Sequence, residues 1–121
     1  MANILIVDDS STMRKIISRS LRQAGLQVDE VYEAGDGIEG LSVLGSGKTI
    51  DLVLSDINMP NMDGLEFIKT LRGNGNTVPV VMITTEGGEE IIKEALASGA
   101  SDSIKKPFTP DQLQEKLGKL L

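Results

Sequence analysis

Five short apolar runs alternate with five stretches of helical periodicity along the chain, and this alternation restricts the fold more than any other feature. The apolar runs predict strands at residues 4–7, 28–33, 52–54, 80–83 and 103–104. Apolar residues at helical spacing predict amphipathic helices at residues 13–24, 38–44, 62–71, 91–96 and 109–121. Strict alternation of this kind is typical of a parallel sheet with helices on both faces. We therefore expect a doubly wound α/β domain of five βα units.

The polarity of the predicted strands indicates their order in the sheet. The first, third and fourth strands are apolar throughout, as strands buried on both faces are, whereas the second is polar and the fifth is short. Polar or short strands belong at the edges of a sheet. With right-handed crossovers these edges favour the order 2-1-3-4-5, which places the ends of the first and third strands side by side.

The composition excludes several kinds of chemistry. The 121 residues include neither Cys nor His, which excludes disulfides, thiolate nucleophiles and phosphohistidine within this chain. The net charge of −6 argues against nucleic acid or an anionic membrane as the main partner. No apolar run approaches the length of a membrane span and no signal-peptide layout is present, so we expect one monomeric, cytoplasmic domain over residues 1–121.

Acidic residues stand where the first and third predicted strands end. Asp8 and Asp9 follow the first strand and Asp56 follows the third, so the expected strand order brings their carboxylates into one crevice. Two unit charges about 4 Å apart repel by roughly 4 kcal/mol at an effective dielectric near 20. Either one carboxyl group keeps its proton or a divalent cation lies among them, and oxygen ligands alone favour Mg²⁺. The simpler alternatives are that Asp56 caps a turn and that surface acids hold no metal.

Hydroxyl and ammonium groups stand at the ends of the other strands. Thr84 and Thr85 follow the fourth strand, and Lys106 follows the fifth. A phosphoryl group on an aspartate would need a cation and a lysine on its oxygens and a hydroxyl to donate a hydrogen bond. Asp56 is therefore a candidate nucleophile. Pro107 stiffens the loop that presents Lys106, although a solvated surface lysine is the alternative.

Two glycine-containing motifs resemble nucleotide-binding sequences only weakly. Residues 35–40, GDGIEG, match a dinucleotide pattern, but they follow a polar edge strand and Asp36 would face the pyrophosphate. Residues 47–49, GKT, resemble the end of a P-loop, but Ser42 stands where the first glycine is required. We expect neither motif to bind a nucleotide.

Together these residues resemble the response-regulator receiver domains, and the resemblance covers the whole chain. It rests on residues 7–14 (VDDSSTMR), 56–64 (DINMPNMDG), 97–100 (ASGA) and 106–109 (KPFT), and on Thr84 with Glu86. The resemblance implies a flavodoxin-like (βα)5 fold.

The resemblance also assigns roles to the residues of the acidic site. Asp56 would accept a phosphoryl group, and Asp9, Asp56 and the backbone carbonyl of Asn58 would bind Mg²⁺. Asp8 would act on the cation through a water molecule, and Lys106 would contact the phosphoryl group.

Other residues would transmit or tune the phosphorylated state if the resemblance holds. The peptide bond before Pro107 would be cis, and Thr84 would move inward on phosphorylation. Asn58 and Glu86 occupy positions that tune self-dephosphorylation in the family. Modulating positions in this chain are Glu86, Thr85 and Ser103. Ser103 replaces the family's usual Tyr or Phe, so the aromatic movement that accompanies the Thr84 shift cannot occur there.

The leading interpretation is a phosphorylation-switched binding module of the chemotaxis type. It would assist its own phosphorylation and dephosphorylation without being an enzyme for other substrates. The implied partners are a histidine kinase, the flagellar motor switch protein and a phosphatase, reached by protein contact because no output domain follows Leu121. Within the family, a phosphate sink and a phosphorelay intermediate are alternatives.

Two alternatives come from other functional classes. A Mg²⁺-dependent phosphohydrolase using an aspartyl-phosphate would need an acid or base for turnover, and Glu86 is the only nearby candidate. A flavodoxin-like nucleotide carrier would need stacking aromatics, and the chain has only Tyr32, Phe67 and Phe108.

Overall fold

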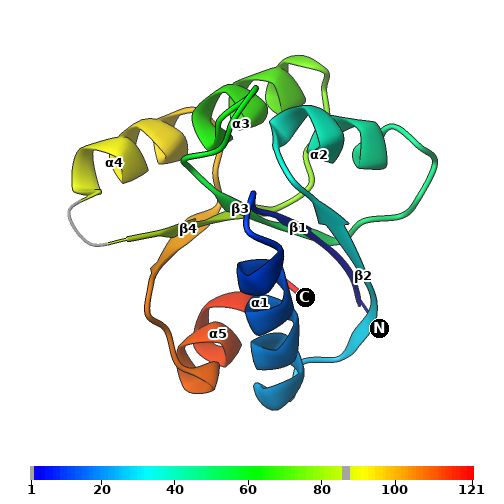
Figure 1. Cartoon of the computed structure of the whole chain (residues 1–121), viewed down its shortest axis with the longest axis vertical. Helices are drawn as coiled ribbons and strands as arrows, with labels where there is room; N and C mark the ends of the chain where they lie inside the picture. The colour runs from blue at the N-terminus through cyan, green and yellow to red at the C-terminus, as the bar shows by residue number, and fades with distance from the viewer. Residues whose placement is uncertain (1, 86–87) are drawn as a thin grey trace.

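The computed structural model describes residues 2–85 and 88–121, which form a five-stranded parallel sheet in the predicted order β2-β1-β3-β4-β5. The strands are β1 (Ala2–Val7), β2 (Val28–Ala34), β3 (Leu52–Asp56), β4 (Val80–Thr84) and β5 (Asp102–Lys105). The helices are α1 (Ser11–Gln23), α2 (Gly37–Leu44), α3 (Gly64–Gly73), α4 (Glu89–Ala97) and α5 (Pro110–Leu117). Helices α2, α3 and α4 cover one face of the sheet, and α1 and α5 cover the other (Figure 1).

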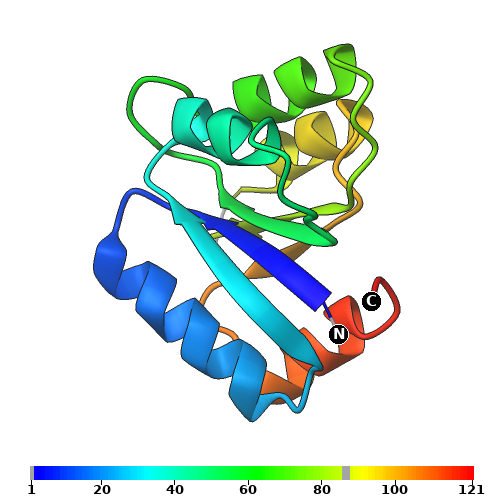
Figure 2. The same cartoon turned by 90° about the vertical axis from the view of Figure 1, so that its right-hand side faces the viewer.

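Each face of the sheet has its own apolar core, because successive side chains of a strand point to opposite faces. Ile4 and Ile6 of β1 belong to the core beneath α1 and α5, whereas Leu5 and Val7 belong to the core beneath α2, α3 and α4. All four side chains are fully buried. Figure 2 shows the two helical layers on either side of the sheet, with β2 at the edge nearest the viewer. The doubly wound architecture is therefore confirmed.

Four of the five helices have an N-cap side chain. Each of these caps fixes the point at which the preceding strand–helix loop ends. The capping residues are Ser10 for α1, Asp36 for α2, Asp63 for α3 and Thr109 for α5. Each side chain accepts a hydrogen bond from a backbone N–H in the first turn. Helix α4 follows Gly88, which has no side chain to make such a bond, and Ala95 is its only buried residue.

Most predicted helix boundaries differ from the structure by a residue or two, and two of the differences have a clear local cause. The last helix ends at Leu117 instead of Leu121, and the N–H of Leu120 donates to the carbonyl of Leu117 in a turn. Gly118 has a low helix propensity, which the leucine spacing alone does not register. The third helix begins at Gly64 instead of Met62 because Asp63 caps it. Across the described residues, no helix has the length and apolar character needed to cross a membrane.

Candidate functional site

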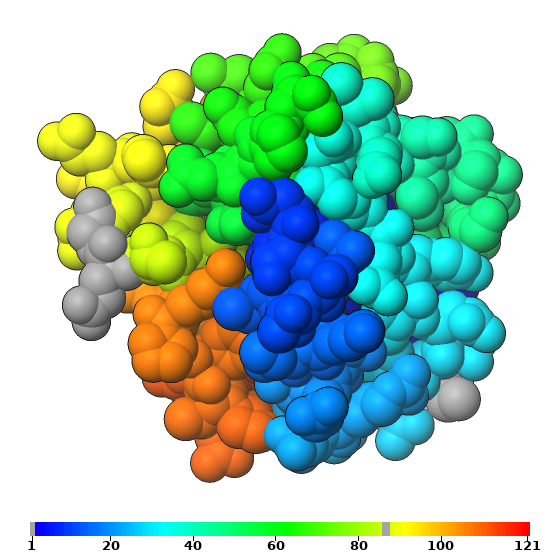
Figure 3. All heavy atoms as spheres, viewed as in Figure 1, coloured from blue at the N-terminus to red at the C-terminus, as the bar shows by residue number. Residues whose placement is uncertain are grey.

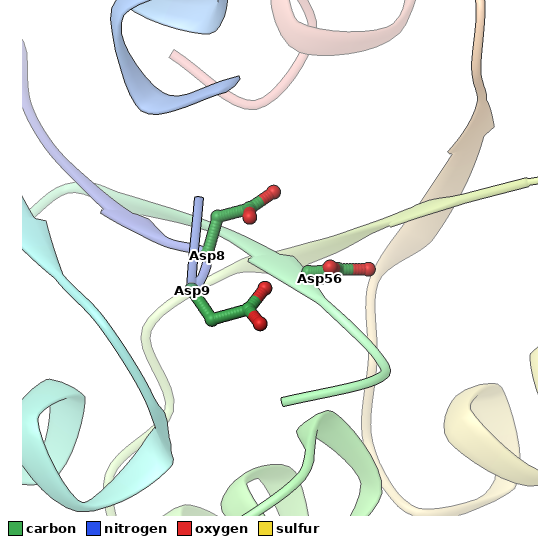
Figure 4. A group of neighbouring side chains, drawn as sticks. All are labelled: Asp8, Asp9 and Asp56. Atoms are coloured by element: carbon green, nitrogen blue, oxygen red, sulfur yellow. The ribbon is translucent and has the colours of Figure 1, made fainter. Parts of the chain in front are cut away.

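The three predicted acids meet at the C-terminal edge of the sheet. Strands β1 and β3 are adjacent, with Val7 opposite Ser55, so the residues that follow them are neighbours. One carboxylate oxygen from each of Asp8, Asp9 and Asp56 lies within 4.8 Å of the other two. In Figure 4 the side chains of Asp8 and Asp9 extend toward the side on which Asp56 lies. The predicted convergence of these acids is confirmed, and we call Asp8, Asp9 and Asp56 the acidic cluster.

Backbone donors hold two of these acids in place. The N–H of Ser10 donates to Oδ1 of Asp8 at 2.9 Å, and the Arg14 guanidinium donates to the Asp8 carbonyl at 2.6 Å. The N–H of Ile57 donates to Oδ1 of Asp56 at 2.8 Å. This bond joins adjacent residues and orients the Asp56 carboxylate, which lies close to Asp8 and Asp9. Asp8 is only 2% exposed, whereas Asp9 is exposed.

Lys106 reaches the acidic cluster from the loop that follows β5. Its Nζ lies 3.5 Å from Oδ2 of Asp8 and 3.9 Å from Oδ1 of Asp56, and its side chain is 16% exposed. The N–H of Lys106 donates to the carbonyl of Thr84, and the Lys106–Pro107 peptide bond is cis, as the resemblance implies. Lys105 instead pairs with Glu89 at the surface. The structure thus places the predicted lysine at the site and its neighbour outside it.

The negative charges around Asp56 outweigh the positive charge of Lys106. Burial raises the pKa of the Asp56 carboxyl group, and the charges of Asp8 and Asp9 raise it further. Lys106 and the Ile57 N–H lower this pKa, but burial is the largest effect. Three carboxylates gather here and Lys106 forms ion pairs with two of them, Asp8 and Asp56, so a divalent cation would relieve the remaining repulsion. All the side-chain donors are oxygens, which suits a hard cation, so the acidic cluster is a candidate metal site.

A hollow of about 140 Å³ opens beside Asp56. Its lining residues are Asp56, Ile57, Asn58, Thr84, Thr85, Gly88, Ile91 and Lys106. Thr85 is exposed, whereas Thr84 is 4% exposed and its hydroxyl finds no hydrogen-bond partner among the described residues. A buried hydroxyl without a partner lowers the stability of the fold, because its desolvation is not compensated. The Thr84 hydroxyl is therefore available to donate a hydrogen bond to an acceptor that enters the hollow. Hydroxyl, ammonium and carboxylate groups therefore border one space, as predicted.

Ser103, another predicted position, does not join this arrangement. Ser103 lies on β5 toward α5, where its N–H donates to Asp102 and its carbonyl accepts from Lys116 at 3.0 Å. It lines a separate hollow between β5 and α5. Glu86 lies outside the described residues.

The dinucleotide-like motif at residues 35–40 leaves no room for a phosphate at its second glycine. A Cβ at Gly37 would lie 2.7 Å from Cγ of Met62. The Asp36 carboxylate accepts from the Glu39 N–H at 2.9 Å and caps α2. The expectation that this motif binds no nucleotide therefore agrees with the packing.

Sequence reasoning identifies the turn at Pro60-Asn61 but misses the contacts that shape the loop after Asp56. The N–H of Gly64 donates to the Ile57 carbonyl at 2.7 Å, and a Cβ at Gly64 would collide with the carbonyl oxygen of Asp56. Asn61 adopts a positive φ of 64°, which asparagine tolerates better than most residues. The run Pro60-Asn61 and the later glycine are turn signals, but their spacing does not show which backbone atoms will meet.

Known proteins match the chain over nearly its whole length. A chemotaxis protein CheY homolog of Campylobacter jejuni is 42% identical over 120 residues, covering 98% of this chain and 91% of the relative. The chemotaxis protein CheY1 of Helicobacter pylori is 42% identical over 116 residues, covering 94% of this chain and 92% of the relative. The chain thus spans almost all of both relatives.

Among solved structures, the chemotaxis response regulator CheY4 of Vibrio cholerae has a TM-score of 0.84 and 39% identity, covering 100% of this chain and 99% of that one. Residues 4–118 match the family described as the response regulator receiver domain, and this range includes the acidic cluster, Thr84 and Lys106. The chain therefore belongs to the response regulator receiver domain family.

Proposed function

We propose that this response regulator accepts a phosphoryl group on Asp56 and signals by binding a partner protein in a phosphorylation-dependent way. The observation that carries the proposal is the shared space bounded by the acidic cluster, the Lys106 ammonium group and the buried Thr84 hydroxyl. An anionic group on Asp56 would find a cationic and a hydroxyl donor already in place there.

In the proposed reaction, a carboxylate oxygen of Asp56 attacks the phosphorus of a phosphohistidine on a partner kinase. An oxygen–phosphorus bond forms, the phosphorus–nitrogen bond breaks, and its electron pair stays on the imidazole nitrogen of the kinase. The Lys106 ammonium group, 3.9 Å from Oδ1 of Asp56, is close enough to contact the transferred oxygens after small movements. The Thr84 hydroxyl would donate a hydrogen bond to one of those oxygens.

The cofactor that we assign to the acidic cluster is Mg²⁺. Asp9, Asp56 and the backbone carbonyl of Asn58 would hold the cation directly, and Asp8 would hold it through a water molecule. When bound, the cation neutralises negative charge on the carboxylates and on the incoming phosphoryl oxygens. The close oxygens of the cluster and the raised pKa of Asp56 support this assignment.

We also propose that the chain assists its own phosphorylation and dephosphorylation but does not turn over other substrates. The hollow beside Asp56 measures about 140 Å³, which suits a phosphoryl group and a few waters better than an organic phosphate ester. Since the chain has no His and no Cys, a general acid or base would have to come from a carboxylate, a lysine or Tyr32. Glu86 and Asn58 remain our candidates for tuning the lifetime of the phosphorylated state.

The relatives named as chemotaxis proteins support a chemotaxis role. We infer that the donor is a chemotaxis-type histidine kinase and that a flagellar motor switch protein receives the signal. A phosphatase would then reset the regulator. Ser103, which replaces the family's usual aromatic residue, favours keeping a phosphate sink or a phosphorelay intermediate as the second candidate.

The acceptor is tested by labelling the protein with a phosphorylated chemotaxis kinase, or with acetyl phosphate, in the presence of Mg²⁺. We expect the native protein to be labelled and the Asp56→Asn variant to remain unlabelled. Asp111→Asn, which neutralises an exposed acid in the first turn of α5, is the matched control and should be labelled normally. Labelling of Asp56→Asn at the native rate would refute the assignment.

A further inference from the structure

The loop between β3 and α3 is tied at its tip to the start of α2. The side-chain amide of Asn61 donates to Oδ2 of Asp36 at 2.8 Å, and the N–H of Gly37 donates to the carbonyl of Met62 at 3.1 Å. Asp36 and Asn61 are 25 residues apart in the sequence. The loop tip is thus held from outside the loop.

Asp36 is well placed to hold the tip firmly. It is 8% exposed, and its two oxygens have separate partners: Oδ1 accepts from the Glu39 N–H at 2.9 Å and Oδ2 accepts from Asn61. The bond from Asn61 is the largest effect that lowers the pKa of Asp36, so the carboxylate is ionised and the bond is charge-assisted. Asn61 reaches this partner with a φ of 64°, a conformation that the bond stabilises.

The same loop carries one side of the candidate metal site. Its base is fixed by the bond from the Gly64 N–H to the Ile57 carbonyl at 2.7 Å, and its tip is fixed by Asp36. Asn58 lies between these two points and lines the hollow beside Asp56. Because both ends are held, the backbone at Asn58 has little freedom to move away from the acidic cluster.

We propose that Asp36 is a positioning residue whose hydrogen bond to Asn61 fixes the β3–α3 loop and thereby sets the affinity of the acidic cluster for a divalent cation. The inference rests on the proposed cation site. A ligand group held in its bound position before the cation arrives loses less conformational entropy on binding. Groups that orient metal ligands without touching the metal commonly change affinity by about tenfold or more.

The test uses Asn61→Asp and the exchanged double variant Asp36→Asn with Asn61→Asp. The single variant sets two carboxylates against each other, while aspartate still tolerates a positive φ. In the double variant the amide introduced at position 36 can donate to the carboxylate introduced at position 61, and the carbonyl of that amide can still cap α2. The double variant also keeps the net charge of the native chain, so the two variants separate the hydrogen bond from the charge.

The readout is the dissociation constant for Mg²⁺ alone, measured by calorimetry at pH 8 and 0.15 M salt, alongside each variant's unfolding midpoint. We expect Asn61→Asp to weaken Mg²⁺ binding by about five- to tenfold and the double variant to return within about twofold of native. Added negative charge near a cation site would by itself tighten binding, so weakening points to the lost hydrogen bond.

The outcomes separate this inference from the proposed function. If the native protein binds Mg²⁺ but Asn61→Asp binds it equally well, with or without a lower unfolding midpoint, the positioning role is wrong and the cation site stands. Failure of the double variant to recover affinity would also overturn the positioning role. If the native protein binds no Mg²⁺, the cation site itself is wrong and the inference falls with it.

Discussion

The ammonium nitrogen of Lys106 lies 3.5 Å from Oδ2 of Asp8, a carboxylate 98 residues away in the chain. This ion pair closes the loop after β5 over the end of β1. In the space-filling view, α1 in blue fills the middle of this face, with cyan atoms of the β2–α2 region on one side and orange atoms on the other (Figure 3). Because Asp8 is almost fully buried, removal of Lys106 would leave a buried carboxylate without this ion pair.

Replacement of Lys106 by Met should destabilise the metal-free protein by about 1–3 kcal/mol, because it leaves buried carboxylates without their cation. Saturating Mg²⁺ should recover much of this loss if the cation occupies the acidic cluster. Urea unfolding with and without Mg²⁺ measures both effects. Lys105→Met is the control: its pair with Glu89 is exposed on both sides, so we expect a change within about 0.5 kcal/mol. Equal losses in the two variants would contradict the special role of Lys106.

The raised pKa of Asp56 predicts a pH dependence of stability. A carboxyl group whose folded pKa is raised binds more protons in the folded state than in the unfolded state, so its ionisation destabilises the fold. The free energy of unfolding should therefore rise as the pH falls through the raised pKa toward the ordinary value of 3.8. Asp56→Asn should remove this contribution and raise the metal-free Tm at pH 7 by about 2–5 °C.

Thermal unfolding of the native and Asp56→Asn proteins between pH 4 and pH 8, in the presence of a chelator, measures the difference. The other carboxylates titrate in both proteins, so the difference between the two curves isolates Asp56. A difference that stays constant over this range would show that the Asp56 carboxyl group has an ordinary pKa.

The arrangement of acids could be predicted because it depends only on strand order and on where each strand ends. The apolar β1, β3 and β4 against the polar β2 and short β5 were enough to order the sheet. Asp8 and Asp56 then had to meet, since parallel strands end at one edge. The residues alone made Asp56 a candidate nucleophile, whereas the separate roles of Asp8 and Asp9 toward the cation came from the resemblance.

Contacts between atoms of separate loops could not be predicted in this way. The bond between Asp36 and Asn61 and the approach of Gly64 to Asp56 depend on the path of loops whose conformation no periodicity records. Asp36 was considered only as part of a weak nucleotide motif, although an aspartate two residues before a predicted helix is a capping signal. The early end of α5 at Leu117 was missed because the leucine spacing continues beyond the glycine.

The unpaired hydroxyl of Thr84 predicts opposite effects on stability and on ligand binding. Thr84→Val replaces a buried hydroxyl that has no partner among the described residues, so the metal-free protein should gain about 1 kcal/mol. The same variant should bind beryllofluoride with Mg²⁺ more weakly by about tenfold or more, since it lacks the donor. Urea unfolding and calorimetry measure the two quantities. Thr85→Val, at an exposed neighbour, should change stability by no more than about 0.5 kcal/mol. A loss of stability in Thr84→Val would mean that the hydroxyl is already paired.

Gly64 allows the loop after β3 to return beneath Asp56, and its replacement by Ala tests how tightly the site is built. The added Cβ would collide with the Asp56 carbonyl oxygen and would lie 2.7 Å from Cε of Met82. We expect a loss of about 2–4 kcal/mol in the free energy of unfolding, because backbone atoms must move to admit the methyl group. Gly73→Ala, at the other end of α3, meets nothing within 4 Å and should instead stabilise the protein by about 0.5–1 kcal/mol. If Gly64→Ala proves as stable as Gly73→Ala, the loop can shift freely beneath Asp56, and the close packing described here does not constrain the site.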